Sequence, residues 1–174
     1  MELLPVESDS RWDQLLARQS GATLFHTIGW LRFQQSQFGF RLFPLVISRQ
    51  GEPVGLFPLF VARRWPLRIS SSPRGIDTLF LGPLVADELL GELLDCYERW
   101  ARSHGISYSC IAFARQIDAA AAQARGYVCE RHKYRVVDLR GGPDEVWKRF
   151  SSECRRKVRR AEKLGVKIVE GDFS

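Results

Sequence analysis

The spacing of apolar residues along the chain predicts several helices. The clearest begins at Asp87, which we expect to cap it, and ends at Gly105. Its apolar positions recur every three or four residues: Leu89, Leu90, Leu93, Leu94, Tyr97, Trp100 and Ala101. Similar patterns predict helices over residues 8–21, 27–39, 115–126, 141–150 and 151–164.

Other stretches are rich in β-branched and aromatic residues, which is typical of strands. Residues 40–64 form two such runs around the turn sequence RQGEP, so we expect a hairpin. Pro44 and Pro58 lie inside these runs and indicate sheet edges or bulges. Further strands are predicted within 65–85, 106–113, 127–139 and 166–171. Because strands and helices alternate, the predicted fold class is α/β (α+β), a mixed sheet flanked by helices.

The composition shifts at Gly141, Gly142 and Pro143, which makes this point the best candidate for a domain boundary. We therefore expect one domain over residues 1–141 and the opening of a second over 142–174. The sequence ends soon after a predicted strand begins, so we expect it to be a truncated piece of a longer protein.

Composition narrows the classes of protein. The chain has 174 residues, of which 45% are hydrophobic, and this is enough to form a core. Its net charge of +6 and its pI of about 9.5 permit anionic partners. The four cysteines have no zinc-ligand spacing, so we expect no metal site, and reduced thiols are the simplest interpretation.

The N-terminal residues lack the basic start and apolar run of a signal peptide. The most apolar later stretch, residues 53–62, contains two prolines and is too short to span a bilayer as a helix. We therefore expect a cytoplasmic protein without a transmembrane segment.

The stretch 151–164 is the most basic in the chain. Six of the nine residues from Arg155 to Lys163 are Lys or Arg. On a helix, Cys154, Val158, Ala161 and Leu164 form a narrow apolar stripe. The helix fits a solvated surface element or a phosphate-binding element, because Arg side chains match phosphate with two hydrogen bonds. Duplex DNA binding is disfavoured because no accompanying DNA-binding motif is present, and membrane binding because the apolar stripe lacks bulky residues.

The order of motifs along the chain resembles the FemABX-like family of acyl and aminoacyl transferases. The matched residues are Phe25, His26 and Trp30, the Ser72-Pro73 turn, Gly82-Pro83-Leu84, Val137-Asp138-Leu139, Trp147, and the block Arg155, Lys157, Arg159, Ala161, Lys163, Gly165 and Val166. The last block is the most specific. Together the matches cover most of residues 20–170.

The resemblance implies tandem GNAT-type domains with the substrate in a cleft between them. It also implies transfer of an acyl or aminoacyl group to an amine acceptor, such as a cell-envelope precursor. The donor would be acyl-CoA or an aminoacyl-tRNA and would not be bound by this part of the protein. The missing second domain is expected to pack on residues 142–174, and the isolated chain is expected to be inactive.

The chain departs from the family pattern at two places. Gln34 stands where members that build peptidoglycan bridges tend to carry a phosphate-contacting Lys, which argues against a nucleotide-linked cell-wall substrate. A Gly-rich pyrophosphate turn is also missing from the sequence. We therefore expect any such turn to lie beyond residue 174.

Within the first predicted domain, four residues are candidates for substrate binding. His26 is either a structural hydrogen-bonding group or part of a substrate-facing motif. Trp30 either packs in the core or forms a wall of the cleft. Ser72 and Arg74 belong to a sequence that is either an ordinary turn or an anion-binding loop.

Arg155 and Arg159 are the candidates in the basic helix. They flank the apolar stripe, so we expect them to point into an interdomain groove and to bind substrate. The catalytic residues are unknown from sequence. Two alternatives to a transferase remain open: a non-enzymatic module that binds RNA or another anion, and an inactive truncated product.

Overall fold

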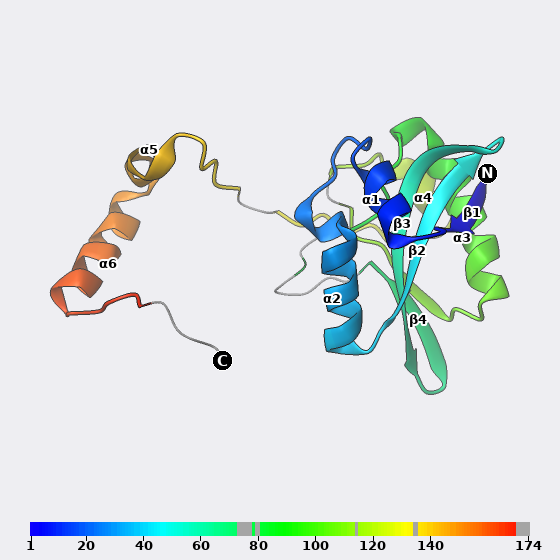
Figure 1. Cartoon of the computed structure of the whole chain (residues 1–174), viewed down its shortest axis with the longest axis horizontal. Coiled ribbons are helices and arrows are strands. Elements are labelled where there is room, and N and C mark those ends of the chain that lie inside the picture. The colour runs from blue at the N-terminus through cyan, green and yellow to red at the C-terminus, as the bar shows by residue number, and fades with distance from the viewer. Residues whose placement is uncertain (73–77, 79–80, 114, 134–135, 170–174) are drawn as a thin grey trace. The chain divides into compact units, whose positions relative to one another are not determined.

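A computed structural model of the chain describes residues 1–72, 78, 81–113, 115–133 and 136–169. The chain forms two compact units, Met1–Cys129 and Glu130–Ser174 (Figure 1). The predicted domain boundary between residues 141 and 142 falls inside the second unit and stays a prediction.

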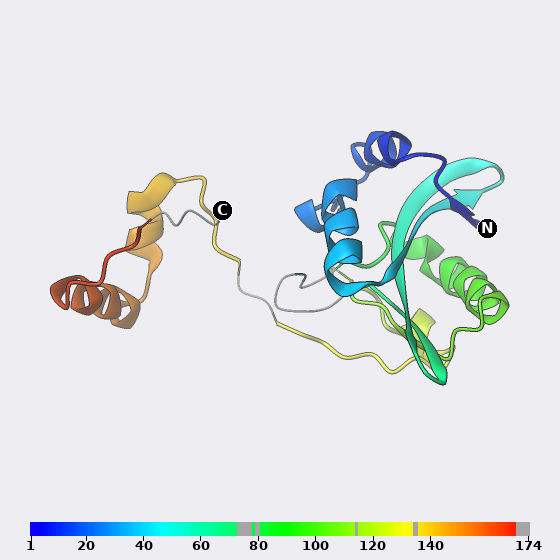
Figure 2. The same cartoon turned by 60° about the horizontal axis from the view of Figure 1, so that its bottom comes forward.

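The first unit is built on a five-stranded mixed sheet in the order β1-β2-β3-β4-β5. All neighbouring strands are antiparallel except β4 and β5, which are parallel. Figure 2 shows β2 and β3 as a long curved hairpin in cyan. The strands are β1 (Glu2–Pro5), β2 (Arg41–Arg49), β3 (Glu52–Arg64), β4 (Leu67–Ser71) and β5 (Tyr108–Cys110). The predicted mixed α/β fold class is thus confirmed.

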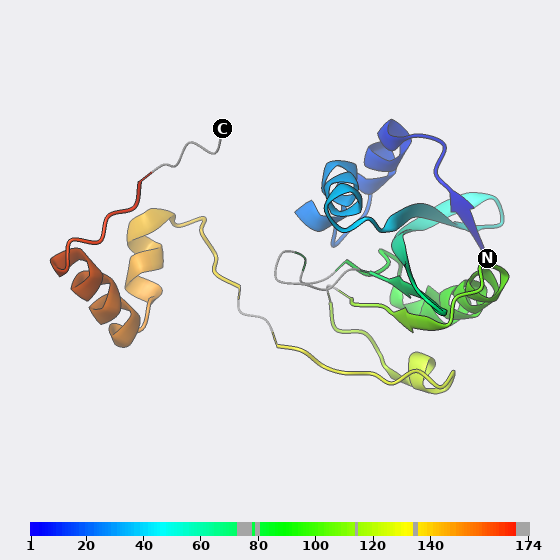
Figure 3. The same ribbon diagram turned by 90° about the horizontal axis from the view of Figure 1, so that it is seen from below.

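Helices cover both faces of this sheet, as Figure 3 shows for the blue helices α1 and α2 on one side and the green helix α3 on the other. The helical elements are α1 (Asp9–Leu16), the 3-10 turn η1 (Leu24–His26), α2 (Ile28–Phe38), the 3-10 turn η2 (Asp87–Leu89), α3 (Leu90–Ser103) and the short α4 (Ala120–Gln123). Along β3, Leu56 and Phe60 pack toward α1 and α2, whereas Phe57 and Leu59 pack toward α3. This alternation follows from the two-residue period of a strand.

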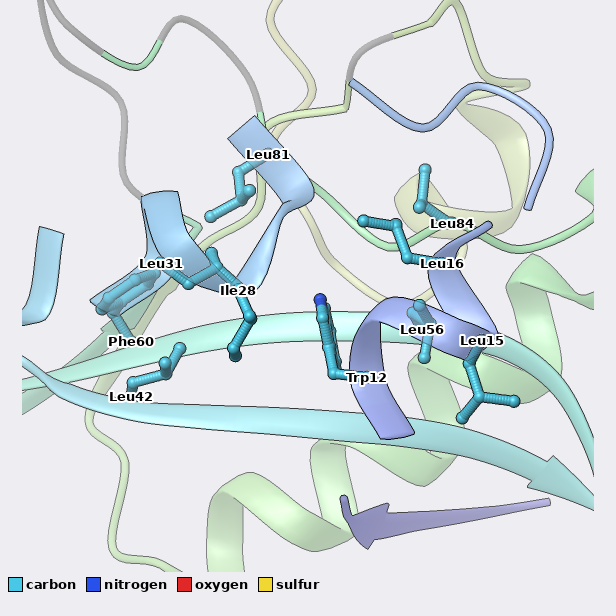
Figure 4. Packing of buried hydrophobic residues seen from close by; sticks show 10 residues of the cluster. All are labelled: Trp12, Leu15, Leu16, Ile28, Leu31, Leu42, Leu56, Phe60, Leu81 and Leu84. Atoms are coloured by element: carbon cyan, nitrogen blue, oxygen red, sulfur yellow. The ribbon is translucent and has the colours of Figure 1, made fainter. Parts of the chain in front are cut away.

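The core beneath α1 and α2 contains ten buried apolar residues from helices, strands and the segment after β4 (Figure 4). Trp12 has no solvent-exposed surface, and its indole Nε1 donates a hydrogen bond of 2.8 Å to the carbonyl oxygen of His26. A buried indole N–H needs such a partner, so this bond joins α1 to the turn η1.

The sequence predicted that the prolines of the hairpin mark sheet edges or bulges, and this prediction was wrong. Pro44 and Pro58 face each other on two inner strands. Each lies just past the residues that pair with the next strand out, because β1 pairs from Leu45 onward and β4 from Phe60 onward. On the β1 side the ladder ends at Pro44, whose carbonyl oxygen accepts a hydrogen bond of 3.0 Å from the backbone N–H of Val6 but which has no N–H to donate in return. The irregularity of the β2–β3 pair lies between Ile47 and Ser48.

Several predicted boundaries were wrong. The cap of the η2 turn is Ala86, and Asp87 instead pairs with the Arg115 guanidinium. The helix expected over 115–126 is limited to α4, and the described residues of 127–139 and 166–169 form no strand. Val128 and Val136 are each 90% exposed. A strand requires a hydrogen-bonded neighbour, and no neighbour for these segments is found among the described residues.

The second unit contains α5 (Gly142–Arg149) and α6 (Ser152–Lys163), both of which the sequence predicted. Pro143 lies in the first turn of α5, and the Ser151 hydroxyl caps α6 by accepting a hydrogen bond of 3.2 Å from the backbone N–H of Cys154. Gly165 follows α6 with a φ of +77°, a conformation that favours glycine. Neither helix has a buried residue.

Among the described residues, no helix has both the length and the hydropathy needed to cross a lipid bilayer.

Candidate functional site

One face of α6 is lined almost entirely by cationic side chains. An open hollow of about 400 Å³ lies along this face. The lining residues are Ser152, Arg155, Arg156, Arg159, Arg160 and Lys163. These positions are three or four residues apart in two adjacent rows, so the helical repeat places them on one side. No carboxylate lines the hollow.

Only one of these cations is neutralised by an ion pair within α6. Glu153 accepts hydrogen bonds from Arg156 at 2.7 and 2.9 Å, and the Lys157 ammonium lies 3.7 Å from the same carboxylate. The hydrogen bonds from Arg156 lower the pKa of the Glu153 carboxyl, which is thus ionised at neutral pH. For Arg155, Arg159, Arg160 and Lys163, no ion pair is found among the described residues. The face therefore keeps a high positive charge.

Two of the arginines are held by α5. The Nη1 of Arg155 donates a hydrogen bond of 3.1 Å to the carbonyl oxygen of Lys148, in the last turn of α5. The guanidinium carbon of Arg159 lies 6.0 Å from the centre of the Trp147 ring, within the range of a cation–π contact. Both predicted site residues of this helix thus contact α5, and guanidinium N–H groups of both remain available for an anion.

The chemistry of this face suits a phosphate-bearing ligand. Arginine presents its N–H donors in a planar fork that binds two oxygens of a phosphate at once. Several guanidinium groups on adjacent helical turns would neutralise a dianion without a metal. No cluster of three or more His, Cys, Asp or Glu that could hold a metal is found in the part of the chain that the structure describes.

His26 lies in the first unit, with no solvent-exposed surface. It forms a capping box with Thr23, whose backbone N–H donates to the imidazole Nδ1 at 3.3 Å. Nδ1 also lies 2.9 Å from the Thr23 hydroxyl, and Nε2 is buried without a hydrogen-bond partner among the described residues. Burial lowers the pKa of the His26 imidazole, and the backbone of Gly82 and Leu81 offsets part of this shift. Nδ1 of His26 thus has a structural role in the capping box, and a substrate-binding role of His26 stays a prediction.

Trp30 is half-buried at the start of α2. Its Nε1 donates a hydrogen bond of 2.9 Å to the hydroxyl of Thr78, and its ring contacts Phe25 and Phe33 at centroid distances of 5.5 and 5.4 Å. Phe33 is 46% exposed, so this aromatic group reaches the surface. Trp30 therefore both packs and presents part of its surface, which is compatible with the predicted cleft wall.

Ser72 is fully buried and joins the two parallel strands beyond their ends. Its backbone N–H donates to the carbonyl oxygen of Cys110 at 3.0 Å, and its hydroxyl accepts a hydrogen bond of 2.7 Å from the backbone N–H of Ala112. Both of these polar groups of Ser72 are thus used inside the protein. Arg74, the other predicted residue of this loop, lies outside the described residues.

The structure brings some of the predicted site residues together. His26 ends η1 and Trp30 lies in the first turn of α2, four residues further on, and Arg155 and Arg159 lie on the same face of α6. The sequence prediction omitted the other lining residues, which are Ser152, Arg156, Arg160 and Lys163. The three- and four-residue spacing of these positions was the signal that would have included them.

Comparisons with known proteins give a structural likeness. No family model and no curated protein matches the chain. The chain is similar to the crystal structure of FemX, with a TM-score of 0.45 and 19% sequence identity. The match covers 61% of this chain and 25% of the FemX chain, so the matched region spans about a quarter of the length of that protein.

Proposed function

We propose that the chain is the N-terminal, acceptor-binding part of a FemABX-like acyl or aminoacyl transferase. The observation that carries the proposal is the cationic hollow on α6, which lies within the most specific block of the sequence motif. Such a transferase moves an acyl or aminoacyl group from acyl-CoA or an aminoacyl-tRNA to an amine. Its acceptor here would be a phosphate-bearing amine, such as a cell-envelope precursor whose phosphate is not part of a nucleotide, because Gln34 argues against a nucleotide-linked substrate.

In this proposal the chain acts by positioning and by charge stabilisation. Arg155 and Arg159 bind the phosphate of the acceptor, which fixes the position of its reacting amine and reduces the entropic cost of the reaction. The same positive charge would stabilise negative charge that develops during acyl transfer. His26, Trp30, Ser72 and Arg74 are retained as predicted substrate-binding residues of the first unit.

We also propose that residues 142–174 open a second GNAT-like domain. The absence of a buried residue in α5 and α6 supports this, because an amphipathic helix pair normally buries one face against another layer. The donor would bind to that second domain, which would pack on residues 142–174. The isolated 174-residue chain should therefore catalyse no transfer, and turnover by the purified chain would contradict this part of the proposal.

Binding of inorganic pyrophosphate tests the acceptor site directly. Isothermal titration of the whole chain should show saturable binding, and Arg155→Gln and Arg159→Gln should each weaken it about tenfold, because a hydrogen bond to a charged group contributes about 1.5–3 kcal/mol. Arg64→Gln is the matched control, since Arg64 is an exposed arginine at the end of β3. Equal affinity for all four proteins would exclude the proposed site.

A non-enzymatic RNA-binding module is the second candidate function. The observation that favours it is the charge distribution: residues 130–174 contain 13 of the 26 Lys and Arg residues and 8 of the 20 acidic residues, so they carry +5 of the net charge of +6. Non-specific RNA binding would weaken steeply with added salt, by orders of magnitude for about six phosphate contacts. A dedicated site for a small phosphate ligand would show little affinity for bulk RNA at any ordinary salt concentration.

A further inference from the structure

Arg155 and Arg159 lie one turn apart on α6, and each is held by a different group of α5. The Lys148 carbonyl that accepts from Arg155 is among the last four of α5, which lack partners within the helix. The C-terminal end of a helix also carries partial negative charge, which attracts a guanidinium. Arg155 is half-buried as a result, although it is one of the longest and most polar side chains.

Arg159 is held in a different way, by the ring of Trp147. Its guanidinium lies over the indole at 6.0 Å. The ring is itself fixed, because Trp147 is half-buried and makes an edge contact with Phe150 at a centroid distance of 5.9 Å. Stacking occupies one flat face of a guanidinium and leaves the N–H groups at its edge free to donate.

We propose that Trp147 is a positioning residue, which orients Arg159 beside Arg155 so that the two guanidinium groups bind one phosphate group as a preformed pair. This inference rests on the proposed function, in which α6 binds the phosphate of the acceptor. An arginine loses considerable rotamer freedom when it binds a ligand. If Trp147 and Lys148 have already restricted that freedom, the ligand binds with a smaller entropic cost.

Pyrophosphate titration of variants of the whole chain tests the inference. Trp147→Leu should weaken binding several-fold, whereas Trp147→Phe, which keeps an aromatic face, should retain most of the affinity. Arg159→Lys should weaken binding although the charge is kept, because an ammonium has no planar fork. Trp147→Leu should cause no further loss in the Arg159→Gln background, since the arginine through which it acts is then missing.

The outcomes separate this inference from the function on which it rests. Failure of the wild-type chain to bind pyrophosphate would overturn both. Wild-type binding that is unchanged by Trp147→Leu, or weakened equally with and without Arg159, would overturn only the role of Trp147. Far-UV circular dichroism checks that α5 and α6 persist in each variant. If Trp147→Leu loses helix, Trp147→Phe and Trp147→Tyr decide instead. Any loss of pyrophosphate affinity that they cause must then disappear in the Arg159→Gln background if the inference is correct.

Discussion

His26 illustrates how one ring nitrogen can take part in capping a local turn, while its Nε2 has no hydrogen-bond partner among the described residues. Capping boxes normally pair Ser or Thr with Glu or Gln three residues later. Here Thr23 pairs with a histidine whose Nδ1 accepts the backbone N–H of the cap residue. A histidine can act in this way only while it is neutral, because a protonated imidazole has no acceptor. The turn η1 therefore depends on the protonation state of His26.

This dependence predicts a loss of stability in mild acid. The folded-state pKa of His26 is lower than its ordinary value of about 6.5. The contribution of His26 to the free energy of unfolding is therefore complete above about pH 6.5. It is lost as the pH falls through the folded-state pKa, because the unfolded chain binds the proton more readily. We expect the urea midpoint to fall between about pH 7.5 and about pH 5.5. His26→Gln should reduce this fall, because glutamine completes a capping box without titrating.

His132→Gln provides the control for this experiment, because the ion pair of His132 with Glu130 at 3.4 Å is exposed and should contribute little to stability. Its pH dependence should match that of the wild type. If His26→Gln also retained the wild-type difference in urea midpoint between the two pH values, His26 would not be the titrating group.

Gly82 is a second residue whose identity is fixed by its surroundings. A Cβ atom at this position would lie 2.7 Å from the carbonyl oxygen of Ala112 and 3.0 Å from the Cα of Phe113, and neither is the end of a flexible side chain. We expect Gly82→Ala to reduce the free energy of unfolding by about 1–3 kcal/mol, as overpacking does. Gly29→Ala, at an exposed helical glycine with no atom within 4 Å, should not destabilise the chain. Equal midpoints for both variants in urea denaturation would contradict this expectation.

At the scale of elements, the sequence correctly predicted the helices and turns that are encoded by residues close together in the chain. The apolar stripe of α3, the helix predicted over residues 27–39 and the turn between β2 and β3 are all encoded by near neighbours, and all were found. Segments 127–139 and 166–171 have the composition of strands, but composition supplies no pairing partner. A strand predicted from composition therefore forms only where the fold also supplies a neighbouring strand for it to pair with.

The residues of the candidate site also divide into those predictable from local spacing and those whose roles depend on distant contacts. The basic face of α6 follows from helical spacing alone, so its cations were predictable. The role of Ser72 depends on Ala112 and Cys110, which lie about forty residues away from it. Likewise, Tyr97, Ser70 and Ser109 form a network of hydroxyl groups that joins α3, β4 and β5. Such contacts between distant residues leave no periodic signal in the sequence.

Helix α2 offers a test of how much its buried face contributes to stability. Leu31 has no solvent-exposed surface, whereas Gln37, on the same helix, is exposed. Leu31→Ala should lower the free energy of unfolding by about 2–5 kcal/mol, because it removes buried methyl groups and leaves a cavity. Gln37→Ala should change it by less than about 0.5 kcal/mol. Chemical denaturation of both variants checks this, and a small effect of Leu31→Ala would contradict the packing described for α2.

At the scale of the whole molecule, stability and charge are divided between the two units. Among the described residues, those of the buried hydrophobic core all lie between Trp12 and Ala122, within the first unit. The second unit holds most of the net positive charge and, among its described residues, has none that is buried. The first unit thus resembles a stable scaffold, whereas the second presents the cationic side chains on which the proposed function depends.

This division predicts very different hydrogen exchange in two helices of similar length. α3 has 14 residues with six buried side chains, whereas α6 has 12 residues with none. Local opening is easiest where few apolar contacts must be broken, so the amides of α6 should exchange orders of magnitude faster than those of α3. Mass spectrometry of the whole chain at two protein concentrations measures this. Protection of α6 equal to that of α3 at both concentrations would show that the second unit has its own cooperative core, whereas protection that rises with concentration would indicate that a second copy covers it.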